Sequence, residues 1–179
     1  RVSLRAAAAG ARGPATFDGT IRKDPADKPQ IVVAAFTRNN DLGFPHADVV
    51  THVSTFSPDL LVFTGDQIYE PVGGFGVQRA PIEKAALDYL RKWIMYGWEY
   101  RSLLRDIPSV ALPDDHDVYH GNIWGAGGRD ANLGPQTLKQ DNGGYTMPPE
   151  WVNMVQRTQT SHLPDPVDPA PIDRGIGVY

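Results

Sequence analysis

The stretch LLVFTGDQIYE (residues 60–70) joins a short apolar run to a polar turn. Its apolar part, residues 60–64, has the length and the Val, Phe and Thr content of a strand that is buried on both faces. Two runs of the same kind stand on either side of it, QIVVAAF (residues 30–36) and SVALP (residues 109–113). The sequence therefore predicts three buried strands.

Two segments between these strands have the apolar spacing of helices. Residues 46–56 follow Pro45, which suits the first turn of a helix, and residues 81–105 begin at Pro81 in the same way. Strands that alternate with helices form a parallel sheet with helices on its faces. We therefore expect the α/β class. Three aromatic residues of the longer helix are expected in the core: Trp93, Trp98 and Tyr100.

The chain divides into an N-terminal extension, residues 1–29, and one domain over residues 30–179. Within the extension, residues 16–24 predict a short hairpin that turns at Asp18–Gly19, and the first residues are expected to fray. Late in the domain, a short helix is expected to begin at Pro148 or Pro149. The Pro-rich tail after that helix is expected to be extended or irregular.

Composition excludes several kinds of site. The chain has 179 residues, a formal net charge of −4 and a pI of about 5.7, so it shows no sign of the basic face of a nucleic-acid-binding protein. It contains no cysteine, which rules out disulfides, thiolate metal sites and a cysteine nucleophile. No apolar run approaches the roughly 20 residues of a membrane-spanning helix.

Each predicted strand is followed by a polar stretch. These stretches are TRNND (residues 37–41), GDQIYE (residues 65–70) and DDHDVYH (residues 114–120). Ligands of open α/β sheets bind at the edge where the carboxyl ends of the strands meet, so the three stretches are expected to be neighbours in space. Their convergence is the main argument for a functional site.

The residue types at this edge favour a metal site. Asp66 and Tyr69 offer hard oxygen donors, and a phenolate is a good ligand for trivalent iron. Asp114, Asp115 and His116 add two carboxylates and an imidazole, and carboxylate-rich sets suit Ca, Mg, Mn or Fe. Two ions about 3.5–4 Å apart could share a carboxylate and activate a water against a phosphoryl group. His116 could then contact the phosphate or protonate a leaving group.

Less specific explanations exist for each of these residues. The acidic run can be a charged turn or a helix N-cap, and Tyr69 can be a packing residue. Asp117 is expected to contact the ligating residues rather than to bind the ligand itself. His120 follows His116 by four residues and would share its face on a helix, so both a place in the site and a purely structural role stay open for it.

VFTGDQIYE followed by LPDDHDVYHGN resembles the alkaline phosphatase D-type metallophosphatases, which belong to the calcineurin-like metallophosphoesterase superfamily. That group carries GDxxY after one strand and DDH[DE] after the next, and here a long helical segment separates the two motifs. The resemblance covers residues 30–125. It implies an αββα sandwich whose metal site lies at the C-terminal ends of parallel strands.

The resemblance also implies roles for single residues. Asp66 matches the carboxylate that bridges two metal ions, and Tyr69 matches the tyrosine that binds iron. Asp115 stands where relatives in the superfamily carry an asparagine ligand, and His116 matches the histidine that contacts phosphate. The implied activity is hydrolysis of phosphate mono- or diesters by a metal-activated water, with two ions drawn from Fe, Ca, Mn and Zn.

Further residues are candidates for binding the metal ions or the substrate. We take Asp114 as another metal ligand, and His120 and Asn122 as contacts to the substrate. The family usually has a Cys or Asp ligand just after its first strand, where Thr37 stands in this chain. Asn39, Asn40 or Asp41 could serve in its place, and Asn39 is our candidate.

The family also has late histidines, typically in a GHxH-like motif, which this sequence lacks. We therefore expect an N-terminal part of a catalytic domain, completed by the remainder of that domain or by a partner chain. Many relatives are exported by the twin-arginine route, which implies a periplasmic or secreted protein. Two other functions stay open: a non-catalytic relative that binds metal or a phosphorylated ligand, and an α/β module whose acidic turn binds one Ca ion.

Overall fold

The computed structural model describes most of the chain. The described residues are 1–7, 13–38, 44–73, 75–119, 123 and 144–161. Three of the predicted site residues, Asn39, His120 and Asn122, lie outside these ranges, and so does the Pro-rich tail, residues 163–179.

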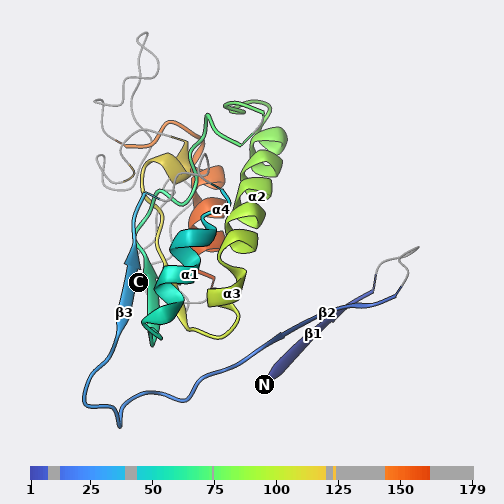
Figure 1. Cartoon of the computed structure of the whole chain (residues 1–179). Coiled ribbons are helices and arrows are strands. Elements are labelled where there is room, and N and C mark those ends of the chain that lie inside the picture. The colour runs from blue at the N-terminus through green and yellow to red at the C-terminus, as the bar shows by residue number, and fades with distance from the viewer. Residues whose placement is uncertain (8–12, 39–43, 74, 120–122, 124–143, 162–179) are drawn as a thin grey trace.

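A three-stranded parallel sheet organises the domain, as the sequence predicts. Its strands are β3 (Val33–Phe36), β4 (Leu60–Phe63) and β5 (Ser109–Ala111), in the order β3-β4-β5. The last residues of the strands are in register, because Phe36 pairs with Phe63 and Phe63 pairs with Ala111. The loops that follow the three strands therefore leave the sheet at one edge (Figure 1).

The helices lie close to the predicted positions. They are α1 (Ala47–Thr55), α2 (Ile82–Glu99), α3 (Arg101–Leu104) and α4 (Pro149–Gln159). The prediction of one continuous helix over residues 81–105 is wrong, since α2 ends and α3 begins at Tyr100. Tyr100 is fully buried and packs edge-on against Phe36 and Phe63, with ring centroids 5.4 and 5.3 Å away. The chain leaves the helical path where this ring enters the core.

One face of the sheet is buried by helices. Leu61 and Phe63 of β4 are completely buried, and Phe36 of β3 stacks on Phe63 with ring centroids 4.6 Å apart. The same cluster takes residues from α1, α2 and α3: Val50, Val53, Tyr96, Leu103 and Leu104. A second cluster joins α2 to α4 and includes the buried side chains of Tyr89, Trp151 and Val155.

The opposite face of the sheet is only partly covered. Val33 is 50% exposed, and Leu60 and Val62, which alternate with the two buried residues of β4, are half-buried. The expectation that these strands are buried on both faces is therefore wrong for β3 and β4. Among the described residues, the helices that pack on the sheet all join the cluster on one face.

Two further expectations need correction. Trp98 is 67% exposed rather than in the core, because it lies on the outer side of α2. The hairpin predicted within residues 16–24 is absent: β2 (Ala15–Gly19) is a single strand that pairs antiparallel with β1 (Val2–Ala6). Gly19 ends this strand close to Arg105, the residue after α3, since an added Cβ would lie 2.5 Å from the carbonyl oxygen of Arg105. The backbone N–H of Thr20 donates to the same oxygen at 3.1 Å, so this end of β2 is held against the domain rather than in a hairpin turn.

The paired strands β1 and β2 form a ribbon that extends away from the domain (Figure 1). Every residue of β1 is exposed, so the ribbon is held by its own backbone pairing. Among the described residues, no helix has the length and the apolar character needed to cross a membrane.

Candidate metal centre

The loops after β4 and β5 are joined by one buried carboxylate, that of Asp117. Its Oδ2 accepts hydrogen bonds from the backbone N–H groups of Asp66 and Asp114, at 2.7 and 2.9 Å. Its Oδ1 accepts from the backbone N–H of Ile68 at 3.0 Å. Burial raises the pKa of Asp117 to about 7, although the backbone donors of Asp114 and Asp66 act in the opposite direction. Asp117 therefore positions both loops and does not face a ligand itself, in agreement with its predicted supporting role.

Glycine at position 65 allows these loops to touch. Gly65 has φ of +106°, and an added Cβ would lie only 2.3 Å from Cβ of Asp114. Its carbonyl oxygen accepts a hydrogen bond from the backbone N–H of Arg38 at 3.3 Å, which brings in the loop after β3. The three polar stretches that follow the strands thus meet at one edge of the sheet.

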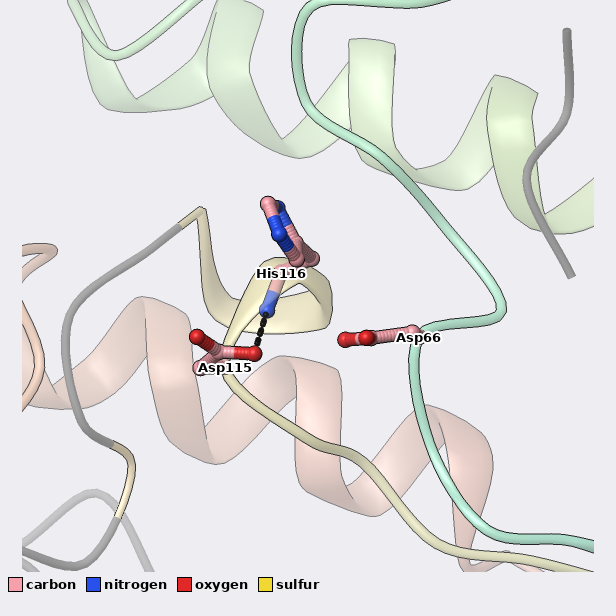
Figure 2. A group of neighbouring side chains, drawn as sticks. All are labelled: Asp66, Asp115 and His116. Carbon is pink, nitrogen blue, oxygen red and sulfur yellow. Dashed lines mark hydrogen bonds between the residues drawn. The ribbon is translucent and has the colours of Figure 1, made fainter. Parts of the chain in front are cut away.

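Three side chains at this edge form a group that could hold a metal ion. They are Asp66 from the loop after β4, and Asp115 and His116 from the loop after β5 (Figure 2). Each offers one ligand atom, and these atoms all lie within 4.8 Å of one another. Asp115 is the N-cap of η2, a short 3-10 helix (His116–Val118), and it accepts the backbone N–H of His116 at 3.0 Å. This helix start places Asp115 and His116 side by side.

Asp66 is the member of the group that best fits a cation. It is 4% exposed, and its Oδ1 is buried without a hydrogen-bond partner. Leaving a buried acceptor unsatisfied costs about 1–3 kcal/mol, and more for a charged group. Burial raises the pKa of Asp66, and the neighbouring Asp115 raises it further. A cation would satisfy the free oxygen and relieve the repulsion between the two carboxylates.

Tyr69 lies against this group, and its role as an iron ligand, which the resemblance implies, stays a prediction. Its hydroxyl donates to Oδ2 of Asp66 at 3.1 Å, and its ring stacks on His116 with centroids 4.3 Å apart. Burial and the negative charge of Asp66 raise the pKa of Tyr69 to about 12. The phenol is therefore protonated at neutral pH in this structure, and ligation would require loss of its proton to a bound cation.

Glu70 holds His116 and was missed by the sequence reasoning. Its Oε2 lies 2.8 Å from Nδ1 of His116, and its side chain is buried. Burial lowers the pKa of His116, but the hydrogen bond and charge of Glu70 outweigh it, so the pKa is raised. The signal was present in the sequence, because Glu70 ends the polar stretch that contains Asp66 and Tyr69.

Arg38 was also missed. It ends the described part of the loop after β3, and its Nε lies 3.8 Å from Oδ2 of Asp66. Its side chain is largely exposed, unlike that of Asp66. The positive charge of Arg38 partly balances the negative charge of the acidic group. The position of Arg38 in the polar stretch TRNND was the signal that could have identified it as a site residue.

The remaining predicted ligand, Asp114, lies at the rim of the site. Its side chain is exposed and is not part of the three-residue group, while its backbone N–H binds Asp117. Asn39, His120 and Asn122 fall outside the described residues, so their predicted roles stay predictions.

Comparison of the chain with protein-family models, with curated proteins and with solved structures gave no match. The family resemblance therefore rests on the two sequence motifs.

Proposed function

We propose that this chain is the N-terminal part of a metal-dependent phosphoesterase that hydrolyses phosphate mono- or diesters. The observation that carries the proposal is the buried, unpartnered Oδ1 of Asp66 beside Asp115 and His116. A carboxylate oxygen in this state suits a metal ligand, and the residues around it are those of the two motifs. The architecture proposed for the complete domain is the αββα sandwich, and the proposed location is the periplasm or the cell exterior.

The ligand set follows from the geometry and the resemblance together. Asp66 and Asp115 are the proposed carboxylate ligands, with Tyr69 adding a phenolic oxygen. Asp114 and Asn39 are proposed to complete the set for two ions of Fe, Ca, Mn or Zn. When bound, such ions supply Lewis acidity, which lowers the pKa of a water molecule and polarises a phosphoryl oxygen.

His116 is the proposed contact to the phosphate. Glu70 accepts a hydrogen bond from Nδ1 when the ring carries its proton there, which fixes the ring and leaves Nε2 as the second polar atom. A protonated Nε2 can donate to a phosphate oxygen or to the leaving group. The raised pKa of His116 favours this protonated form. His120 and Asn122 are proposed to contact the same substrate.

The partly covered face of the sheet favours a further layer. Val33, Leu60 and Val62 would gain burial from the remainder of the catalytic domain or from a partner chain. That second layer is also where the late histidines of the family are proposed to lie.

Metal binding is the first test. We expect Mn²⁺ at 100 times its Kd to raise the free energy of unfolding by about 2.7 kcal/mol, measured by urea denaturation. Asp66→Asn and Asp115→Asn should each remove this gain while keeping the fold. Asp27→Asn is the matched control, because Asp27 is an exposed acid paired only locally with Lys23. Equal stabilisation of the Asp66→Asn variant would refute the proposed site.

Activity is the second test. The metal-loaded chain, and a version extended at its C-terminus, are assayed with p-nitrophenyl phosphate and bis-p-nitrophenyl phosphate. We expect turnover that Asp66→Asn reduces to background and that Asp27→Asn leaves unchanged. Metal binding at Asp66 without turnover of either ester by either protein would contradict catalysis and favour the non-catalytic relative.

A further inference from the structure

A cavity of about 380 Å³ lies between α2 and the segment that precedes it. Its walls come from two parts of the chain: Phe75, Gln78, Lys84, Leu87, Asp88 and Arg91. None of these residues belongs to the group of Asp66, Asp115 and His116. The volume falls within the range of small-molecule sites.

Arg91 lines this cavity, and two donors of its guanidinium group have no hydrogen-bond partner. Its Nη1 donates to the sulfur of Met95 at 3.1 Å, whereas Nε and Nη2 are buried without a hydrogen-bond partner. The N–H bond of Nε and one N–H bond of Nη2 lie in the guanidinium plane and run parallel along one edge of the group. This is the fork that binds the two oxygens of a carboxylate. The two unpartnered atoms, Nε and Nη2, are therefore the two donors that bind a carboxylate in a bidentate manner.

Asp88 adds a buried acceptor one helical turn away on the same face of α2. It is 5% exposed, and its Oδ2 accepts the hydroxyl of Tyr119 at 2.7 Å and pairs with Lys92 at 2.9 Å. Its Oδ1 is buried without a hydrogen-bond partner. Because Lys92 already balances the charge of Asp88, this oxygen fits a neutral donor better than a second cation.

The other lining residues indicate the charge and the apolar character of a ligand that would fit the cavity. Lys84 and Arg91 leave the lining positively charged, since Asp88 is matched by Lys92. This balance favours an anion over a zwitterion, whose ammonium group these two cations would repel. Phe75 and Leu87 are 67% and 68% exposed, and they offer apolar surface to the body of a ligand.

From these contacts we infer that the cavity is a binding site for a small organic carboxylate with an apolar body and a hydroxyl group beside the carboxylate. The carboxylate binds Nε and Nη2 of Arg91, and the hydroxyl donates to Oδ1 of Asp88. The apolar body lies on Phe75 and Leu87. Phe75 now lies over the guanidinium, with its ring centroid 4.9 Å from Cζ, and its exposure lets the ring rotate aside as the ligand enters.

Isothermal titration calorimetry with three matched probes tests the contacts from the ligand side. The probes are 3-phenyllactate, 3-phenylpropionate, which lacks the hydroxyl, and 3-phenyl-1-propanol, which lacks the carboxylate and its neighbouring hydroxyl. The chain is first freed of metal on a chelating resin, because a hydroxy acid can also chelate a cation. We expect 3-phenyllactate to bind about tenfold more tightly than 3-phenylpropionate, and 3-phenyl-1-propanol not to bind. Equal affinity for all three probes, or no binding of 3-phenyllactate, would overturn the inference.

Arg91→Gln tests the same contact from the protein side. It should weaken the binding of 3-phenyllactate by about tenfold or more while leaving the binding of Mn²⁺ unchanged. Arg101→Gln is the matched control, since this arginine stacks on Trp98 and is not in the cavity wall. Thermal unfolding checks that both variants fold. If Arg101→Gln weakens binding as much as Arg91→Gln, the site is not the one inferred.

Discussion

The acidic run at residues 114–117 divides into separate roles at the scale of single residues. Asp114 is exposed, Asp115 caps η2 and joins His116 in the metal group, and Asp117 is buried. Asp117 accepts three backbone N–H groups from two loops. The repulsion expected among neighbouring carboxylates is limited because the side chains do not share one environment.

Asp117→Asn tests the structural role of the buried carboxylate. The amide has one acceptor oxygen and places an N–H₂ group against a backbone donor, so at least one buried N–H loses its partner. We expect the free energy of unfolding to fall by about 1–3 kcal/mol in urea denaturation of the metal-free chain.

Asp114→Asn is the comparison for this substitution. Its side chain is exposed, so the stability of the metal-free chain should change by less than about 0.5 kcal/mol. Equal losses in the two variants would show that net charge, rather than the contacts of Asp117, decides the effect.

At the scale of elements, the site depends on how closely the loop after β4 approaches the loop after β5. Gly65 has a positive φ and lies directly against Asp114. Residues 66–70 then carry Asp66, Tyr69 and Glu70 toward the start of η2. A side chain at position 65 would separate the two halves of the metal group.

Gly65→Ala should therefore destabilise the chain and weaken metal binding together. The strained φ and the clash with Asp114 are expected to cost about 2–5 kcal/mol of unfolding free energy. Gly97→Ala is the matched control, because Gly97 lies in α2 with no atom within 4 Å of an added Cβ. It should gain about 0.5–1 kcal/mol from helix propensity. A Gly65→Ala chain as stable as the original would show that the loops do not meet as described.

At the scale of the whole molecule, the chain consists of an exposed ribbon and a domain with two core clusters. The ribbon contacts the domain at its end, where the backbone N–H of Thr20 donates to the carbonyl oxygen of Arg105 at 3.1 Å. Within the ribbon, Asp18 of β2 accepts hydrogen bonds from Ser3 of β1 and from Arg1, which precedes β1. The ribbon and the metal centre are thus supported by different contacts.

Deletion of residues 1–14 tests this separation. Because β1 is exposed along its length, we expect the free energy of unfolding to change by less than about 1 kcal/mol. The affinity for Mn²⁺ should stay the same. A larger loss of stability would mean that β1 supports the domain core.

The sequence by itself determined that the three strands are parallel, that helices lie between them and at which edge of the sheet the polar stretches meet. These features follow from local patterns, such as the apolar run at residues 60–64 and prolines at helix starts, which act over a few residues. The same patterns identified Asp66, Asp115 and His116 as candidate site residues, because each lies in the polar stretch that comes after a strand.

Only the tertiary structure decided how these side chains are used. It turned Asp117 inward, paired Glu70 with His116, placed Arg38 beside Asp66 and ended α2 at Tyr100. Each outcome depends on contacts between residues far apart in the sequence, and burial there sets hydrogen bonding and pKa values that no local pattern contains. The free oxygen of Asp66, on which the proposed function rests, is a property of that packing alone.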